Sequence, residues 1–296
     1  MKLASYVKSD GTPGCGIVTD GDAPGVIDLG GRPGGASSLR ALLARDGWQG
    51  SLEPLAGAAP DFPLAGLTFL PVIPDPDKIL CVGINYASHV AETGRETPVK
   101  PMIFTRFANS QAGHGQPMIR PAASERFDFE GELAVVIGAP ARNVAPEDAA
   151  ACIAGFSCYN DGSIRDWQRH TTQFAPGKNF PATGAFGPWL VTPDEFGEVA
   201  SRRLVTRLNG EVMQSAGFDD LIFDVPTLIS YCSHFTRLEP GDVIITGTTG
   251  GVGAFRTPPV WMAPGDEVEV EISGIGVLRN TVVDESPERP VSAIWR

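Results

Sequence analysis

The sequence lacks the signatures of several common protein classes. Its five cysteines are scattered and form no Cys-x-x-Cys pair, which disfavours a zinc site or a thioredoxin-like redox centre. No stretch approaches the roughly 18 consecutive apolar residues of a transmembrane helix. The first ten residues contain no apolar core of the length that a signal peptide needs. These absences predict a soluble, cytoplasmic protein with reduced thiols.

Basic residues are also scarce. The chain has 23 Lys and Arg against 35 Asp and Glu, which gives a formal net charge of −12. Nucleic acids and anionic membranes attract basic surfaces, so neither is an expected partner. An anionic substrate would have to be met by cations placed locally, because the protein as a whole repels it.

Two familiar loop motifs are missing as well. No Gly-x-Ser-x-Gly sequence occurs, which disfavours a serine nucleophile of the α/β-hydrolase type. The glycine-rich run 247–253 lacks the Lys-Ser/Thr pair of a phosphate-binding loop and does not fit Gly-x-Gly-x-x-Gly. The run is compatible with a tight turn between strands. It is equally compatible with a loop that lets backbone amides and Thr248 approach a ligand closely.

What the sequence does contain is a long series of short strand patterns. They begin near residue 78 and are separated by turns rich in proline and glycine, of which the chain has 26 and 35. We predict a mainly β (α+β) fold, because helical patterns are few. The predicted strands are 79–83, 102–105, 132–137, 153–159, 203–208, 242–246 and 267–272, and the predicted helices lie near 86–93, 146–153, 163–170 and 226–234.

The first quarter of the chain differs from the rest. It is rich in Gly, Ala and Pro, with short strand patterns and one helical pattern at 38–46. Three prolines between residues 71 and 76 then indicate a linker at 69–77. A chain of 296 residues is long enough for about two domains. We therefore predict a small N-terminal β-rich domain at 1–70 and a second domain at 71–296.

The most informative pattern is the pair Glu130 and Glu132 in Phe-Asp-Phe-Glu-Gly-Glu, directly before the apolar run 133–137. Residues i and i+2 of a strand point to the same face, so the two carboxylates would stand side by side. At ~6 Å and an effective dielectric of ~20 they would repel by roughly 2–3 kcal/mol. A divalent cation would convert this repulsion into binding, because carboxylate oxygens suit Mg²⁺, Mn²⁺ and Ca²⁺. A solvated strand face is the alternative.

A second pattern places His89 and Glu92 three residues apart in Asn-Tyr-Ala-Ser-His-Val-Ala-Glu. On a short helix both side chains share a face and can form a hydrogen bond. A carboxylate that holds an imidazole fixes its tautomer and raises its basicity, which suits activation of a water molecule. The alternative is a pair that occurs by chance on a surface helix.

A third group follows the strand predicted at 153–159. Asp161 stands where that strand gives way to a turn, a position typical of both turn-forming and ligand aspartates. Arg165 and Gln168 are three residues apart and could present donors together to a developing oxyanion. Lys178 lies in Pro-Gly-Lys-Asn-Phe, where a solvated turn lysine is the alternative.

Taken in order, these segments resemble landmarks of the fumarylacetoacetate hydrolase family over 78–280. Further matching landmarks are Gly-Pro-Trp-Leu-Val, Leu-Asn-Gly-Glu-Val and Pro-Gly-Asp-Val-Ile-Ile-Thr-Gly-Thr. Residues 1–70 resemble the small N-terminal domain of the shorter bacterial members. The resemblance implies a mixed β-roll or barrel catalytic domain, a homodimer, and one Mg²⁺ or Mn²⁺ (sometimes Ca²⁺) per subunit.

The resemblance also implies a role for each candidate residue. Asp128 shares the strand face of Glu130 but matches no ligand position of the family. The implied metal ligands are Glu130, Glu132 and Asp161; the implied catalytic residues are His89, Glu92 and Lys178; the implied substrate contacts are Arg165, Gln168 and Thr248.

The reaction implied by the family is cleavage of a C–C bond in a β-diketo acid, such as an acylpyruvate like fumarylpyruvate or a diketo-deoxy sugar acid. The metal would stabilise the departing enolate, and His89 with Glu92 would activate a water. Decarboxylation, enol–keto isomerisation and hydration of a 2-oxo acid are alternatives within the same fold. A catalytically silent cation-binding protein is an alternative of another class, although such a protein would need neither His89 nor Lys178.

The sequence departs from the family pattern near the site. Asn-Phe-Pro-Ala-Thr follows Lys178 in place of Ser-Phe-Asp-Thr, and Thr249 replaces a proline. Gly162 stands where a larger apolar residue is common. The segment 104–115 also differs from the frequent version that contains Lys-Pro. It brings in Arg106 and His114 as further candidates for substrate contact, with a structural loop histidine as the alternative for His114.

Overall fold

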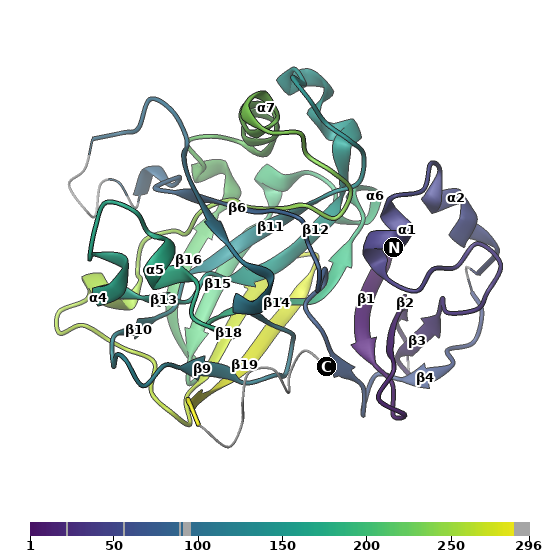
Figure 1. Cartoon of the computed structure of the whole chain (residues 1–296), viewed down its shortest axis with the longest axis horizontal. Coiled ribbons are helices and arrows are strands. Elements are labelled where there is room, and N and C mark those ends of the chain that lie inside the picture. The colour runs from purple at the N-terminus through teal and green to yellow at the C-terminus, as the bar shows by residue number, and fades with distance from the viewer. Residues whose placement is uncertain (22, 56, 89, 91–95, 287–296) are drawn as a thin grey trace.

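The computed structural model describes residues 1–286 except residues 22, 56, 89 and 91–95 (Figure 1). Within this range the chain forms three sheets, of twelve, five and two strands. The predicted mainly β (α+β) class is confirmed. The sheets mix parallel and antiparallel pairs, and the described strands form no closed barrel.

The twelve-stranded sheet runs through the whole molecule. Ten of its strands lie side by side in the order β4 (Phe62–Pro63), β3 (Gly25–Asp28), β2 (Pro13–Thr19), β1 (Lys2–Val7), β14 (Gly184–Val191), β12 (Ile153–Asn160), β11 (Gly131–Ile137), β17 (Val243–Ile245), β6 (Ile79–Gly83) and β7 (Met102–Arg106). Two short strands join from the side, β5 (Thr68–Phe69) on β1 and β8 (Gln111–Ala112) on β14.

The five-stranded sheet packs against the middle of the first one. Its order is β16 (Glu211–Gly217), β15 (Arg203–Leu208), β18 (Glu267–Ile272), β19 (Gly276–Asp284) and β9 (Met118–Arg120). A small third sheet pairs β10 (Phe127–Asp128) with β13 (Ser163–Ile164). Figure 1 shows β15, β18 and β19 running across β11 and β12, and side chains from these strands share one apolar core.

Strand β11 is buried on both faces, as its continuous apolar run 133–137 predicts. Leu133 and Val135 point into the core shared with the five-stranded sheet. Ala134 and Val136 point the other way, into a core that also contains Leu39 from the N-terminal segment. Because successive strand residues alternate between faces, one short strand joins the two cores.

Helices are short and lie around the sheets. They are α1 (Leu39–Leu43), α2 (Trp48–Leu52), α4 (Arg165–Gln168), α5 (Ala175–Lys178), α6 (Pro193–Phe196) and α7 (Val225–Phe235), with 3₁₀ turns at η1 (Glu53–Leu55), η2 (Ala108–Ser110), η3 (Pro146–Cys152), η4 (Val199–Ser201), η5 (Phe218–Asp220) and η6 (Gly253–Phe255). The helix predicted near 226–234 is confirmed as α7, and the one near 146–153 is a 3₁₀ turn.

The helix predicted at 163–170 is wrong in its first residues. Ser163 and Ile164 form β13 and pair with Asp128 and Phe127 of β10. The strand pairing satisfies their backbone groups, so the helix begins only at Arg165. The helix predicted near 86–93 falls partly outside the described residues.

The N-terminal strands continue the main sheet. β1 pairs with β14 through Lys2–Val191 and Leu3–Leu190. The segment predicted as a linker, 69–77, contains the buried Val72, whose carbonyl accepts a hydrogen bond of 2.8 Å from Ser5 Oγ. The division of the chain at residue 70 stays a prediction.

We expect Leu133→Ala to lower the free energy of unfolding by about 2–5 kcal/mol, because it leaves a cavity between the two main sheets. Val212→Ala, at an exposed position of β16, is the control and should change it by less than about 0.5 kcal/mol. Urea titration followed by circular dichroism measures both. Equal effects of the two substitutions would contradict this assignment of the core.

Candidate metal and active site

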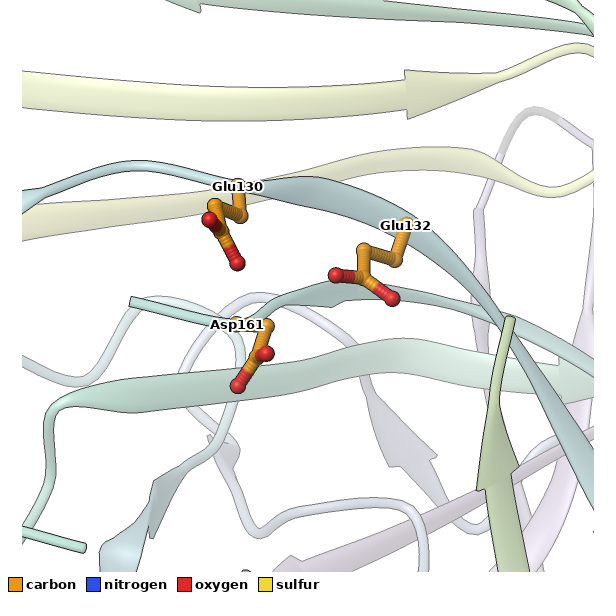
Figure 2. A group of neighbouring side chains, drawn as sticks. All are labelled: Glu130, Glu132 and Asp161. Atoms are coloured by element: carbon orange, nitrogen blue, oxygen red, sulfur yellow. The ribbon is translucent and has the colours of Figure 1, made fainter. Parts of the chain in front are cut away.

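Three carboxylates meet where β11 and β12 lie side by side. Glu130 precedes β11, Glu132 is its second residue, and Asp161 directly follows β12. The Asp161 amide donates a 2.8 Å hydrogen bond to the Glu130 carbonyl, which fixes the two chains at this point. One oxygen of each carboxylate lies within 4.8 Å of the others, and all three residues are buried. Figure 2 shows the two glutamates on one side of their strand, facing Asp161.

Lys178 lies against this cluster. Its Nζ is 2.5 Å from Asp161 Oδ2, forms an ion pair with Glu130, and donates to the Asp161 carbonyl at 3.2 Å. The side chain is 1% exposed, so the alternative of a solvated turn lysine is wrong. Helix α5, which ends at Lys178, turns the side chain inward. Gly177 allows this approach, because a Cβ there would lie 2.4 Å from the Gln168 backbone nitrogen.

Arg165 is the second cation beside the cluster. Its Nη2 lies 2.6 Å from Glu130 Oε1, and its Nε donates to Asp128 Oδ2 at 2.7 Å. Its Nη1 donates to Gln168 Oε1 at 2.9 Å, so the i, i+3 pair predicted for Arg165 and Gln168 does meet. Two hydrogen bonds, from Nε and Nη1, thus orient Arg165, and Nη2 forms the ion pair with Glu130.

Asp128 is a residue of this site that the sequence reasoning left aside. It is completely buried, and its two oxygens also accept from the amides of Gly253 and Ala254, at 2.8 and 2.9 Å. It therefore ties Arg165 to the end of the glycine-rich run 247–253. Its alternation with Glu130 in Phe-Asp-Phe-Glu was the available signal, but no family motif pointed to it.

The glycine-rich loop does deliver backbone amides to the site. The Gly247 amide donates to Glu132 Oε2 at 2.6 Å, and φ is +101° at this residue, a conformation that favours glycine. Thr248 lies beside it, where its Oγ1 donates to the Gly131 carbonyl at 3.0 Å and accepts from Gln214 Nε2 at 2.8 Å. The hydroxyl of Thr248 thus holds the loop against β11.

One cavity gathers most of the predicted site residues. Its walls include Glu130, Glu132, Arg165, Gln168, Lys178 and Thr248. The sequence reasoning missed two further parts of the cavity wall. One is an apolar side with the rings of Phe104, Phe174 and Phe255, and the other is the cation Arg169. No motif assigned them a role, because they come from parts of the chain that are far apart in the sequence. His89 and Glu92 lie outside the described residues, so their role stays a prediction.

Arg106 and His114 do not line this cavity. His114 packs edge-on against Phe69, with 5.5 Å between the ring centres, and its Nδ1 accepts from the Arg279 amide at 3.2 Å. Burial lowers the pKa of His114, which agrees with a neutral, structural histidine. Arg106 lies behind Asp161, with Nη1 2.6 Å from Oδ1, and so contacts a predicted ligand rather than the cavity.

The charges of the cluster do not balance. Burial, followed by the charges of Asp161 and Glu130, raises the pKa of Glu132 well above its ordinary value. Burial opposes the charge on Lys178, but Asp161 and Glu130 outweigh it and raise the pKa of the ammonium, which stays protonated. Among the described residues, Glu132 makes no ion pair of the kind that Glu130 and Asp161 make.

These residues fit a divalent cation. Three buried carboxylates supply hard oxygen ligands of the type that Mg²⁺, Mn²⁺ and Ca²⁺ prefer. A cation beside Glu132 would offset the carboxylate that lacks an ion-pair partner among the described residues. Glu130, Glu132 and Asp161 are the residues that would hold it.

We expect Glu132→Gln to weaken Mn²⁺ binding by at least the roughly 10–100-fold that loss of an outer-shell partner typically costs, since it removes a ligand charge. Titration followed by electron paramagnetic resonance measures the free Mn²⁺. Glu267→Gln, an exposed carboxylate on β18, is the control and should bind Mn²⁺ as the parent protein does. Unchanged binding by Glu132→Gln would contradict the assignment of this ligand.

Known proteins are similar to this chain in sequence and in fold. The family model for the C-terminal domain of fumarylacetoacetate (FAA) hydrolase matches residues 78–283. A mitochondrial oxaloacetate tautomerase of Bos taurus is 43% identical over 231 residues, which are 77% of this chain and 74% of that protein.

Two solved structures resemble nearly the whole chain. One is a 5-carboxymethyl-2-hydroxymuconate delta-isomerase from Mycobacterium smegmatis, with a TM-score of 0.77, 31% identity, and coverage of 96% of this chain and 100% of that one. The other is a maleylpyruvate hydrolase from Sphingobium sp. SYK-6, with a TM-score of 0.80, 27% identity and the same coverage.

The similar proteins differ in the reaction that their names give. By name they include a tautomerase, an isomerase and a hydrolase, and the tautomerase is mitochondrial. No helix among the described residues is long and apolar enough to cross a membrane. The cytoplasmic location and the homodimer stay predictions. The match over 78–283 and the identity to the tautomerase confirm the resemblance: the chain belongs to the fumarylacetoacetate hydrolase family.

Proposed function

We propose that this protein is a divalent-metal-dependent enzyme that interconverts the keto and enol forms of a 2-oxo dicarboxylic acid of the oxaloacetate type. The carrying observation is the buried triad Glu130, Glu132 and Asp161, whose two glutamates line one cavity with the buried cations Lys178 and Arg165. The 43% identity to an oxaloacetate tautomerase supports this choice among the reactions of the family. A divalent cation bound there would supply Lewis acidity toward the oxygens of a 2-oxo acid.

The protein residues have distinct tasks in this reaction. Lys178 stays protonated, so it serves as a fixed positive charge for the oxygen that becomes negative in the enolate. Arg165, held by Asp128, keeps Glu130 oriented and adds positive charge to the cavity wall. The proton that leaves or joins carbon needs a base, and a protonated lysine cannot be that base. We assign the proton transfer to the predicted pair His89 and Glu92.

Hydrolysis of a C–C bond in an acylpyruvate is the second candidate, and the likeness to a maleylpyruvate hydrolase favours it. It uses the same stabilised enolate and the same charges, but His89 and Glu92 would activate a water in place of moving a proton at carbon. The cavity therefore suits both reactions, and the identity of the products decides between them.

A catalytically silent cation-binding protein is less compatible with the site. Lys178 Nζ lies 2.5 Å from an oxygen of the predicted ligand Asp161, and Arg165 Nη2 lies 2.6 Å from an oxygen of Glu130. Cations this close to the ligands repel a metal ion and weaken its binding. A site selected only for binding a cation has no use for them, whereas an enzyme for anionic substrates does.

The direct test is an assay of the purified protein with the enol form of oxaloacetate and, separately, with acylpyruvates. With Mg²⁺ or Mn²⁺ we expect faster loss of the ultraviolet absorbance of the enol, and no such effect after removal of the metal or in Glu132→Gln. Mass analysis of products separates the alternatives, because hydrolysis yields pyruvate with a carboxylic acid and decarboxylation yields CO₂. Turnover of acylpyruvate without enol conversion would replace the first candidate by the second.

We expect Lys178→Met to lower kcat for enol conversion by roughly 10²–10³-fold, the typical effect of removing one donor to a developing oxyanion. Mn²⁺ should bind at least as tightly as to the parent protein, because a cation beside two ligands has been removed. Steady-state kinetics at saturating Mn²⁺ and a Mn²⁺ titration measure the two effects. A kcat close to that of the parent protein would exclude Lys178 from the reaction.

A further inference from the structure

Arg106 has an unusually complete set of partners behind the metal triad. It ends β7, and its side chain is fully buried. A guanidinium has five N–H groups, and five hydrogen bonds leave this one. They run from Nη1 to Asp161 Oδ1 (2.6 Å) and the Gly162 carbonyl (3.0 Å), from Nη2 to the Ser110 carbonyl (3.2 Å) and Thr183 Oγ1 (3.0 Å), and from Nε to Ser110 Oγ (3.1 Å).

Two glycines make room for this arrangement. A Cβ on Gly184, the first residue of β14, would lie 2.7 Å from Arg106 Nη2 and 2.8 Å from its Cζ. A Cβ on Gly162 would lie 2.0 Å from the Thr183 carbonyl, so only glycine lets the Asp161 turn come this close to Thr183. The guanidinium thus occupies a space that a larger residue at position 184 would reduce, and a larger residue at position 162 would push the Asp161 turn away from Thr183.

The contact divides the two oxygens of Asp161 between different tasks. Oδ1 accepts the short, charge-assisted bond from Arg106 on the side away from the cavity. Oδ2 is 2.5 Å from Lys178 Nζ, on the side of Glu130. A carboxylate held in this way can offer a cation one oxygen in a fixed direction, and cannot rotate to offer both.

We propose that Arg106 is a positioning residue that makes Asp161 a one-oxygen ligand of the divalent cation. The proposal rests on the metal site of the proposed function but not on the identity of the substrate. Outer-shell partners of this kind orient the ligands of metal sites and set their affinity. The fork of an arginine is essential here, because an ammonium with three donors can keep the charge but cannot serve all five acceptors.

The test compares three substitutions by Mn²⁺ titration with electron paramagnetic resonance. Arg106→Lys keeps the charge, Arg106→Gln removes it, and Gly184→Ala displaces the guanidinium while leaving it in the protein. We expect Arg106→Gln to weaken Mn²⁺ binding by roughly 10–100-fold, with smaller losses for the other two. The activity of Arg106→Lys, relative to that of the parent protein, should be higher at saturating Mn²⁺ than at limiting Mn²⁺, because excess metal compensates for the weaker binding.

Arg202→Gln is the matched control. Arg202 is partly buried and donates its Nε to the Phe196 carbonyl at 2.8 Å, with no carboxylate partner among the described residues. The Arg202→Gln variant should bind Mn²⁺ as the parent protein does, even if its unfolding temperature is lower. Circular dichroism checks that each variant is folded, and if Arg106→Gln does not fold, Arg106→Lys and Gly184→Ala decide.

Two results would overturn the proposal. One is Mn²⁺ affinity within twofold of the parent protein in the folded Arg106 and Gly184 variants. The other is an equal loss of affinity in Arg202→Gln, which would show a general effect of destabilisation. Either can occur while the parent protein still converts a 2-oxo acid. Conversely, Mn²⁺ binding that depends on Arg106 in a protein without such activity would reject the proposed function alone.

Discussion

The site depends on the compensation of charge in the protein interior. An ion removed from water loses several kcal/mol of solvation, and removing one partner of a buried ion pair typically costs about 3–5 kcal/mol. The positions of the groups are therefore interdependent, and no single one of them explains the geometry. Among the described residues, the buried carboxylates of the site are Asp128, Glu130, Glu132 and Asp161, and its buried cations are Arg106, Arg165 and Lys178.

The sheet supplies the frame that makes this compensation possible. The pairing of β11 with β12 places Glu130 opposite Asp161. Gly131 pairs with Asn160, and Glu130 and Asp161 are the next residues along the two chains, joined by a backbone hydrogen bond. The cations then come from β7, α4 and α5. Glycines at 162, 177 and 184 have no side chain, so the chain segments around the site can approach each other closely at these three positions.

The sequence predicted the cluster of carboxylates better than the partners of those carboxylates. Glu130 and Glu132 follow from strand periodicity, and the buried strand after them follows from its apolar run, because both signals are local. The ion pairs of Lys178 with Glu130 and of Arg106 with Asp161 join residues 48 and 55 positions apart. No spacing rule reaches that far, and a lysine in a glycine turn has the same local pattern whether it is buried or solvated. The helix expected from 163 failed for a related reason, since pairing with the distant β10 decided the structure of its first two residues.

The unequal count of charges also indicates how the site can accept ligands. Among the described residues the buried cluster holds four carboxylates and three cations, and burial together with the charges of Asp161 and Glu130 raises the pKa of Glu132 well above its ordinary value. A bound divalent cation would favour the ionised form of Glu132, because it offsets that charge. The cation would add two positive charges to the site, and the negative charges of a doubly charged acid would then offset them. Binding of the two ligands is thus mutually favourable, because each offsets the charge that the other introduces. Under the proposed function the fixed cations therefore act twice: Lys178 and Arg165 limit how negative the interior is before the metal arrives, and Lys178 then stabilises the negative oxygen of the enolate.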